Sequence, residues 1–566
     1  MFLPTTLEEV ESLGWRQLDV VLITGDSYVD SPFIGAAVIG KVLLQHGYRV
    51  GVIAQPDIQS EIDITRLGEP LLFWGVTSGS VDSMVANYTA TGKRRKHDDY
   101  TPGGLNTRRP DRAVIVYSNL IRRFFKHTVP IVLGGIEASL RRIPHYDCWS
   151  NSIRRSILFD AKADILIYGM GEKAVLSLAD KLKRRESFTE NRGICYIAGS
   201  ARSDYIELEP FEKVSDDPLS FSRMFHIFYQ NNDSLTATGL CQKHGARYLI
   251  HTPSCPPLSQ SEMDAVHDLN FERDLHPYYR KQGDVRALET IRFSISTHRG
   301  CYGECNFCAI AVHQGRTVQW RSQASILREV KEIIAHPAFK GIISDVGGPT
   351  ANMYGFECRK KQIKGACSDK RCLYPEICDH LKVNHRQQIN LLRAIREIKA
   401  VRHVFVASGI RYDIILADQK NGQEYLTEVV HHHTSGQMKI APEHTENEVL
   451  DLMGKPGMDS LIEFKRLFDA ICKTSGKQLY LTYYFMVAHP GCTEAHVGRL
   501  KTFVSRHLHM IPEQVQVFTP TPSTVSTLVY HTGVDTISGA PVFCEKQVKK
   551  KEKQKQMLLK RPAAGG

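Results

Sequence analysis

The sequence predicts an α/β protein in which a doubly wound parallel sheet is followed by a partial (β/α)6, TIM-like barrel. Two observations predict this class. Short apolar segments typical of buried strands alternate with segments of helical spacing in both halves of the chain. Glycine-rich turns follow several of the strand-like segments. With 566 residues, the chain is long enough for about two to four domains with ample cores.

Residues 1–209 are predicted to form the doubly wound domain. The strand-like segments are Asp19–Thr24, Tyr48–Ala54, Leu71–Val76, Ala113–Tyr117, Pro130–Leu133 and Ile165–Tyr168. Helical spacing is found in Phe33–Gln45, Asn119–Lys126 and Lys173–Arg184. Alternation of this kind favours a parallel sheet with helices on both faces.

Two glycine-rich turns in this domain, Gly134–Glu137 and Gly169–Glu172, follow predicted strands. Ligands bind at that edge of open α/β sheets, but tight turns need glycine in any case. A polar insertion, Asp82–Arg109, contains the basic run Lys93–His97. It could contact a phosphate-bearing substrate or form a solvated face, and both interpretations stay open.

Residues 210–287 lose regular periodicity and are interpreted as a bridging segment ahead of a barrel at residues 288–533. The predicted barrel strands are Ile291–Thr297, Gly341–Val346, His403–Ala407, Met438–Ala441, Leu479–Met486 and Gln514–Phe518. The predicted helices between them are Ser322–Ala335, Ile389–Ile398, Glu446–Leu452, Asp459–Thr474 and Ala495–His507. In β/α barrels, functional residues gather at the carboxyl ends of the strands.

Three cysteines, Cys301, Cys305 and Cys308, follow the first predicted barrel strand with C-x3-C-x2-C spacing. A compact loop can direct three such thiolates toward one soft metal centre. An electron-carrying [4Fe–4S] cluster normally has four cysteine ligands, so three would leave one iron open. A zinc site completed by a distant His, or three inert thiols, are the alternatives.

This motif, with the aromatic Phe307 before its third cysteine, resembles the signature of the radical S-adenosylmethionine (SAM) enzymes. The wider context resembles the YgiQ-type (UPF0313) proteins, through Ile291–Ser294, Arg299–Cys301 and His313–Arg316. The resemblance covers roughly residues 19–533.

The resemblance implies a radical SAM enzyme in which Cys301, Cys305 and Cys308 hold a [4Fe–4S] cluster whose fourth iron chelates SAM. Reductive cleavage of SAM would give a 5′-deoxyadenosyl radical that acts on an unidentified substrate. A flavodoxin- or ferredoxin-type electron donor is the expected partner. The implied cofactor-binding residues are Phe307, Gly347, Gly348, Ser408, Arg411 and Glu443. No further catalytic residue is assigned, and His489 is left as a structural histidine.

Two other functions stay open. The protein could be a cluster-bearing redox or sensor protein that does not cleave SAM, or an RNA-binding protein with a structural metal site. The net charge of +11 gives nucleic-acid binding only weak support, because residues 545–566 alone hold eight Lys or Arg against two Glu. Residues 534–566 are expected to be a disordered basic tail that replaces the family's usual C-terminal extension and leaves one side of the barrel more open.

Two features of the sequence bear on cobalamin and on a second metal centre. The N-terminal domain resembles cobalamin-binding modules, but the D-x-H-x-x-G motif is missing near Gly25–Tyr28. The sequence therefore argues against cobalamin. A second group, Cys358, Cys367, Cys372 and Cys378, favours a second cluster or a zinc ion over free thiols, although its spacing fits neither standard zinc pairing.

The N-terminus lacks the features of a secretory signal, and no apolar stretch approaches the roughly 20 residues of a membrane span. Fourteen cysteines without an export signal favour metal ligation in a reducing compartment. We therefore expect a cytoplasmic protein.

Overall fold

The computed structural model describes residues 1–559 and divides the chain into two compact units. Unit 1 comprises Met1–Pro257 and Ala265–Arg292, and unit 2 comprises Leu258–Asp264 and the chain from Phe293 onward. Helix α11 (Gln260–His267) contributes residues to both units.

Unit 1 is built on a nine-stranded sheet with the order β10-β11-β12-β9-β8-β5-β4-β1-β3. Strands β3, β1, β4, β5 and β8 are parallel, and β9, β12 and β11 pair antiparallel beyond them. The strands are β1 (Val20–Thr24), β3 (Val50–Ala54), β4 (Phe73–Thr77), β5 (Ile131–Leu133), β8 (Ile165–Ile167), β9 (Ile194–Ala198), β10 (Ile206–Leu208), β11 (Leu240–His244) and β12 (Arg247–His251). The parallel part reverses its winding direction between β1 and β4, which is the position where open α/β sheets bind ligands.

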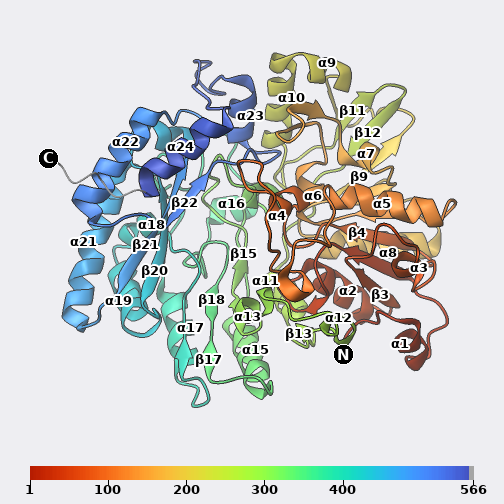
Figure 1. Ribbon diagram of the computed structural model, residues 1–566, viewed down its shortest axis with the longest axis horizontal. Helices are drawn as coiled ribbons and strands as arrows, with labels where there is room; N and C mark the ends of the chain where they lie inside the picture. Colours follow the sequence, from red (N-terminus) through yellow and green to blue (C-terminus); the bar gives the residue numbers. More distant parts are fainter. Residues whose placement is uncertain (560–566) are drawn as a thin grey trace. The chain divides into compact units, whose positions relative to one another are not determined.

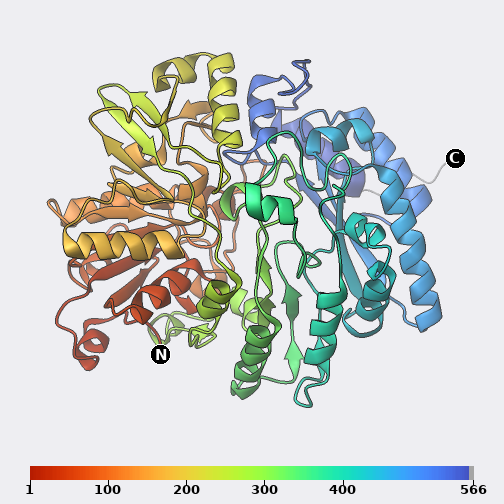
Figure 2. The same cartoon turned by 180° about the vertical axis from the view of Figure 1, so that it is seen from behind.

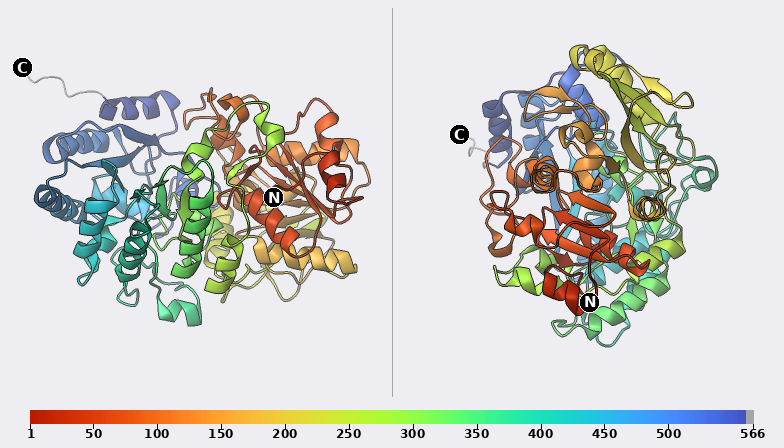
Figure 3. Two further views of the ribbon diagram at one scale, coloured as in Figure 1. Left: turned by 90° about the horizontal axis from the view of Figure 1, so that it is seen from below. Right: turned by 90° about the vertical axis from the view of Figure 1, so that its right-hand side faces the viewer.

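Helices cover both faces of this sheet (Figures 1 and 3). Val20 and Leu22 pack in one core cluster with residues of α2 (Gly35–Gln45) and α8 (Glu172–Arg184). Val21 and Ile23, which point to the opposite face, pack with residues of α5 (Ala113–Phe124) and α6 (Gly135–Leu140). Because neighbouring residues of β1 face different cores, all five of its side chains are buried.

Shorter elements complete unit 1. They are α1 (Leu7–Ser12), β2 (Val29–Asp30), α3 (Ile62–Thr65), α4 (Ser83–Asn87), the 3-10 turn Pro102–Gly104, β6 (His145–Asp147), β7 (Ser152–Arg154), α7 (Ile157–Asp160), α9 (Phe211–Asp216), α10 (Pro218–Gln230), β13 (Asp274–Leu275), α12 (Pro277–Arg280) and α13 (Ala287–Ile291).

Two predictions for this half of the chain differ from the structure. The segment Ala113–Tyr117, predicted as a strand, is the start of helix α5. Its buried residues recur at helical spacing as far as Ile121, but a short apolar run does not distinguish a helix from a strand. Residues 210–257, predicted to bridge two domains, belong to unit 1 and supply β11 and β12 to its sheet.

Up to residue 559, unit 2 contains six parallel strand positions that are connected in chain order. Strand β14 (Ser294–Ser296) pairs with β18 (Asp345–Gly347), and β17 (Ile342–Ile343) pairs with β19 (His403–Val404). A parallel bridge between Ile410 and Ile440 leads to β20 (Gln437–Glu443). That strand pairs with β21 (Tyr480–Val487), which pairs with β22 (Gln514–Val517).

Helices connect these strands and lie outside them. Helices α15 (Gln323–Ala335) and α17 (Arg386–Arg396) flank β17 and β18 in both Figure 1 and Figure 2. Helices α21 (Met458–Ser475) and α22 (Glu494–Phe503) lie on the outer side of β20 to β22. The remaining elements are β15 (His298–Arg299), α14 (Ile310–His313), β16 (Gln319–Trp320), α16 (Arg359–Lys364), α18 (Tyr412–Ala417), α19 (Gly422–His432), α20 (Asn447–Met453), the π-helical turn Val504–Leu508, α23 (Val525–Thr532) and α24 (Val548–Leu559). The general prediction of an α/β protein with a large parallel sheet is confirmed.

The C-terminal segment differs from its prediction, because helix α24 is ordered and packs against unit 2 (Figures 1 and 3). Gln554 is fully buried and accepts a hydrogen bond from the Ala488 amide at 2.9 Å. The Lys551 ammonium donates to the Tyr530 hydroxyl at 2.9 Å, and Leu558 is buried. The lysine-rich composition hid a helix that buries one face against unit 2, so this segment is not the free tail that was predicted. The last seven residues of the predicted tail lie outside the described residues.

Between residues 1 and 559, the structure contains no helix that is both long enough and apolar enough to span a membrane.

Candidate functional site

The loop with the three cysteines follows β14 and is fastened to helix α20. The Asn306 amide donates to the Met453 carbonyl at 2.8 Å, and its side chain donates to the Leu452 carbonyl at 2.9 Å. The Cys308 amide donates to the Cys305 carbonyl at 2.9 Å, which closes a turn between these two cysteines. Glu304 adopts a positive φ of 44° and forms an ion pair with Arg316 at 2.6 Å. These contacts anchor the loop within unit 2.

Gly303 lies between two of the thiols. Its amide donates to Cys301 Sγ at 3.3 Å. A Cβ atom at this position would lie 3.3 Å from Cys301 Sγ, 3.6 Å from Cys305 Sγ and 2.6 Å from Arg411 Nη1. Only glycine therefore leaves the space between these thiols and the guanidinium open.

Burial favours the neutral form of two of these thiols. Burial raises the pKa of Cys301, and burial together with the nearby Cys305 raises the pKa of Cys308 to about 12. A metal centre would have to displace these protons, so its assembly would release them.

Within the part of the chain that the structure describes, no three His, Cys, Asp or Glu side chains are arranged to hold a single metal ion. A [4Fe–4S] cluster makes a different demand, because each thiolate binds a separate iron. The donor set of Cys301, Cys305 and Cys308, with space kept open at Gly303, fits such a cluster with one iron free of protein ligands.

Arg411 precedes helix α18 and reaches the cysteine loop. Its Nε lies 2.9 Å from both carboxylate oxygens of Asp413, and its Nη1 lies 3.9 Å from Cys305 Sγ. Its Nη2 is buried without a hydrogen-bond partner. Burial opposes the charge, but the Asp413 carboxylate outweighs it and raises the pKa of Arg411, so the guanidinium stays charged. A buried charged donor without a partner is costly, and a ligand carboxylate would satisfy it.

The backbone of Arg411 is fixed by Asn352. The Arg411 amide donates to Asn352 Oδ1 at 2.8 Å, and Asn352 Nδ2 donates back to the Arg411 carbonyl at 2.9 Å. This reciprocal pair ties the segment after β18 to the segment after β19.

Gly347, Gly348 and Ser408 lie at neighbouring strand ends. A Cβ at Gly347 would lie 3.2 Å from the Ser408 Cβ, and one at Gly348 would lie 2.6 Å from the His298 ring. A side chain at Gly348 would therefore force the buried His298 ring to move, whereas one at Gly347 would make a tight contact with Ser408. The Ser408 hydroxyl donates to Asp345, whose other oxygen accepts the Ser408 amide at 3.0 Å. Ser408 is thus bonded within the protein, rather than presenting a free hydroxyl.

Glu443 ends β20 with a left-handed φ of 69°, after a break in the strand register. Burial raises the pKa of Glu443 to about 7, although Lys455 acts in the opposite direction. The Lys455 ammonium donates to the Ala441 carbonyl at 2.6 Å. A carboxyl group that titrates near neutrality at a strand end is typical of functional sites.

Phe307 packs edge-to-face against His489 at a centroid distance of 6.2 Å. His489 is fully buried, and its Nε2 lies 2.7 Å from the Ser526 hydroxyl. Burial lowers the pKa of His489 to about 3, so its imidazole is neutral at neutral pH.

Two residues of this site were not predicted from the sequence. Thr350 Oγ1 lies 3.5 Å from Cys301 Sγ, and Asp413 holds the guanidinium of Arg411. Thr350 follows the Gly347–Pro349 turn, and Asp413 lies two residues after Arg411. Their proximity to predicted residues was the available signal.

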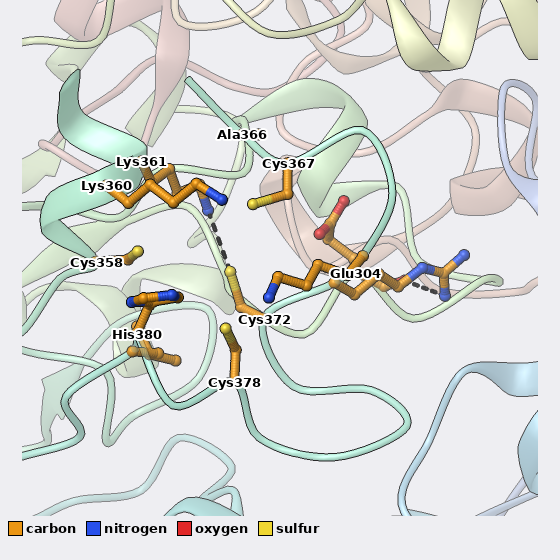
Figure 4. Close-up of a pocket in the computed structure, with 12 residues that line it drawn as sticks. Glu304, Cys358, Lys360, Lys361, Ala366, Cys367, Cys372, Cys378 and His380 are labelled. Carbon is orange, nitrogen blue, oxygen red and sulfur yellow. Dashed lines mark hydrogen bonds between the residues drawn. The ribbon is translucent and has the colours of Figure 1, made fainter. Parts of the chain in front are cut away.

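The second cysteine group lines one pocket, together with Glu304 of the first loop (Figure 4). The Lys361 ammonium lies 3.7 Å from Cys372 Sγ. None of the four cysteines is in a disulfide.

The carboxyl edge of the unit 1 sheet is filled by the polar insertion. Arg109 is buried and pairs with Asp26 at 2.8 Å and with Asp98 at 3.0 Å. Its Nη1 donates to the Ser78 carbonyl at 2.5 Å. The segment Gly25–Tyr28, near which a cobalt-ligating histidine was sought, is therefore linked to the insertion.

Comparison with known proteins places the chain in a family. Residues 2–294 match the radical SAM N-terminal model, and residues 295–504 match that of the radical SAM superfamily. A UPF0313 protein of Fusobacterium nucleatum is 56% identical over 561 residues, covering 99% of each chain. A UPF0313 protein of Thermotoga maritima is 49% identical and covers 99% of this chain and 98% of the relative. The chain therefore belongs to the radical SAM superfamily of enzymes and, within it, to the UPF0313 proteins.

These matches confirm the predicted resemblance and extend it, since they cover nearly the whole chain instead of residues 19–533. The C-terminal segment is thus largely shared with these two relatives.

Among solved structures, the cobalamin-dependent radical SAM enzyme OxsB, with aqua-cobalamin and SAM bound, has a TM-score of 0.50 at 12% identity. The alignment covers 88% of this chain and 53% of that chain. The argument against cobalamin is therefore wrong, because a protein of this fold holds that cofactor. The missing D-x-H-x-x-G motif indicates only that a histidine from that position is lacking.

Proposed function

We propose that Cys301, Cys305 and Cys308 hold a [4Fe–4S] cluster in a partial (β/α)6 barrel formed by unit 2, and that the protein cleaves SAM reductively. The observation that supports this most directly is the space that Gly303 leaves open between Cys301 Sγ, Cys305 Sγ and Arg411 Nη1, beside a guanidinium whose Nη2 has no hydrogen-bond partner. It lies where successive parallel strands end, which is the functional end of β/α barrels.

The cluster, when bound and reduced, supplies one electron that splits SAM into methionine and a 5′-deoxyadenosyl radical. The protein's residues bind and orient SAM. Arg411 suits the SAM carboxylate, because a guanidinium pairs with a carboxylate through two hydrogen bonds. Gly347 and Gly348 let the backbone approach the SAM amino group, and Phe307 shelters the adenine. Glu443 offers a polar contact from β20.

The substrate class is not defined by these residues. A flavodoxin- or ferredoxin-type protein is proposed as the electron donor. Free cysteines and an oxygen-sensitive cluster suit a reducing compartment, so we propose the cytoplasm as the location.

The test is anaerobic reconstitution of the full chain with iron and sulfide, reduction with dithionite in the presence of SAM, and measurement of 5′-deoxyadenosine. The wild-type chain should release it. Cys308→Ala should release none, because one iron loses its protein ligand. The matched control Cys472→Ala, on helix α21, should behave as the wild type.

A wild-type protein that carries the cluster but releases no 5′-deoxyadenosine would instead indicate a redox or sensor protein. Retention of RNA by the metal-free chain that weakens with salt would favour the RNA-binding alternative.

A further inference from the structure

Four cysteines outside the first loop line a single pocket in unit 2. They are Cys358, Cys367, Cys372 and Cys378, and His380 lies beside them. Figure 4 shows the four sulfur atoms directed toward the same space. Cysteines scattered over 21 positions of a lysine-rich segment would not face one pocket unless the fold gathered them.

The fold holds this segment firmly. Cys358 is buried and packs in a core cluster with Tyr302, Leu373 and Leu381, against which Cys372 also packs. The Cys378 amide donates to the Cys372 carbonyl at 2.9 Å, and the Leu381 amide donates to the Cys378 carbonyl at 2.8 Å. The thiols therefore stand on an ordered scaffold that is anchored beside the first loop.

Positive charge surrounds the pocket. Lys360, Lys361, Lys370 and Arg371 line it, and Lys361 is itself buried with its ammonium 3.7 Å from Cys372 Sγ. Four thiolates bound to a metal centre carry net negative charge, which these cations would offset. Lys361 also donates to the Arg316 carbonyl and lies over the Tyr302 ring, so these contacts hold its charge beside the pocket.

The way the donors are grouped bears on which metal the pocket would hold. A structural zinc ion needs four donors at about 2.0 to 2.3 Å from one point. Across residues 1–559, no such single-ion arrangement of three or more donors is present. A [4Fe–4S] cluster instead takes four thiolates that are spread around it, one on each iron.

We propose that Cys358, Cys367, Cys372 and Cys378 bind a second [4Fe–4S] cluster, in which all four irons have protein ligands. With no open iron, this cluster carries electrons and does not bind SAM.

The second cluster would lie beside the loop that holds the first cluster, which suits transfer of an electron between the two clusters. Glu304 of that loop lines the same pocket. Arg371, the neighbour of Cys372 in sequence, donates to the Glu304 carbonyl at 3.1 Å and to Asn306 Oδ1 at 2.6 Å. A one-electron protein donor would reduce the second cluster, which would return to its oxidised state by passing that electron to the first cluster. Only this relay rests on the proposed function, because binding of the second cluster does not depend on SAM chemistry.

The test counts iron and acid-labile sulfide in the full chain after anaerobic reconstitution. The wild-type chain should hold about eight irons, and the triple variant Cys301→Ala, Cys305→Ala, Cys308→Ala should keep about four of them, because a [4Fe–4S] cluster contains four irons. The quadruple variant Cys358→Ala, Cys367→Ala, Cys372→Ala, Cys378→Ala should also keep about four, held by the first loop. The control Cys472→Ala should match the wild type.

Electron paramagnetic resonance of the reduced variants assigns each cluster. Added SAM should change the spectrum of the quadruple variant, whose cluster has an open iron, and should leave that of the triple variant unchanged. If the quadruple variant does not fold, the double variant Cys367→Ser, Cys378→Ser keeps the buried Cys358 and should still lose the SAM-insensitive signal.

The proposal is overturned if the triple variant retains no iron, or if it binds one zinc ion per chain instead. A wild-type chain with two clusters and no 5′-deoxyadenosine would contradict only the proposed function. A chain that makes 5′-deoxyadenosine with one cluster would contradict only the second site.

Discussion

Two buried arginines lie where parallel strands end, Arg109 in unit 1 and Arg411 in unit 2. Their guanidinium N–H groups differ in how many have a hydrogen-bond partner. Arg109 pairs with both Asp26 and Asp98 and also donates to the Ser78 carbonyl. Arg411 pairs with Asp413 alone, faces the Cys305 thiol and keeps Nη2 without a partner. The same residue type at the same kind of sheet edge is thus fully paired in one unit and partly free in the other.

This difference separates a structural role from a binding role. A saturated buried ion pair contributes through the cost of breaking it, because its removal leaves unpaired charges. A donor left over in a buried site marks a position where a ligand would improve the hydrogen bonding. Substitutions at the two arginines and at their neighbours should therefore differ in what they change.

The largest effect is expected at Arg109. Arg109→Met keeps most of the side-chain volume but leaves Asp26 and Asp98 buried without their cation, which should destabilise unit 1 by about 3–5 kcal/mol. Urea unfolding, with hydrogen exchange of peptides that cover β1 and β4, measures this loss. Arg94→Met is the matched control, because Arg94 is half-exposed and its contact with Asp111 is 3.8 Å long. It should change stability by less than about 1 kcal/mol. Equal effects of the two substitutions would remove the structural role assigned to Arg109.

The next effect concerns the carboxyl group of Glu443 in the metal-free protein. Its pKa of about 7 when folded lies above the ordinary value of 4.5, so the folded chain keeps a proton that the unfolded chain has released. Stability should therefore fall as pH rises from 4.5 to 7, by about 3 kcal/mol from this group. Glu443→Gln should remove that part of the slope, as judged by urea unfolding at pH 5 and pH 7.5. Identical slopes in the variant and the wild type would show that Glu443 is not buried as the structure has it.

A smaller effect, on the affinity for SAM, is expected when Arg411 is replaced by a residue that keeps the positive charge but has no planar guanidinium. Arg411→Lys should weaken binding of SAM to the reconstituted protein by about 10- to 100-fold, because a lysine cannot make two parallel hydrogen bonds to a carboxylate. Equilibrium dialysis with labelled SAM measures the change. Arg393→Lys, at a partly exposed pair with Glu428, should leave the affinity within about twofold of the wild type. Unchanged affinity in Arg411→Lys would place the carboxylate of SAM elsewhere.

The strands that carry the two sites could largely be predicted from the sequence. The side-chain contacts at their ends could not, for physical reasons. The strands around Cys301 and Arg411 were found because apolar segments of unit 2 alternate clearly with helices of regular spacing. The ion pairs of Arg109 with Asp26 and Asp98 could not be predicted, because these residues are separated by up to 83 positions and come together only in the folded protein. Composition misled at Lys551 and Gln554, whose polar side chains are buried through specific hydrogen bonds. Periodicity misled at Ala113–Tyr117, where five residues in a row suit a strand or a buried helix equally well.

The smallest effect is expected at Gly303, where the space between the thiols and Arg411 depends on the missing side chain. Gly303→Ala would put a methyl group 2.6 Å from Arg411 Nη1 and 3.3 Å from Cys301 Sγ. Because the nearer atom ends a long side chain that can move, the cost should fall near the lower end of overpacking, about 1 kcal/mol. The reconstituted variant should then lose iron to a chelator about fivefold faster than the wild type, since 1.4 kcal/mol corresponds to a factor of ten. Gly498→Ala in helix α22 is the matched control, because its added Cβ meets nothing within 4 Å. If both variants keep iron equally well, the first cluster does not lie between these thiols and Arg411, and the free donor of Arg411 needs another explanation.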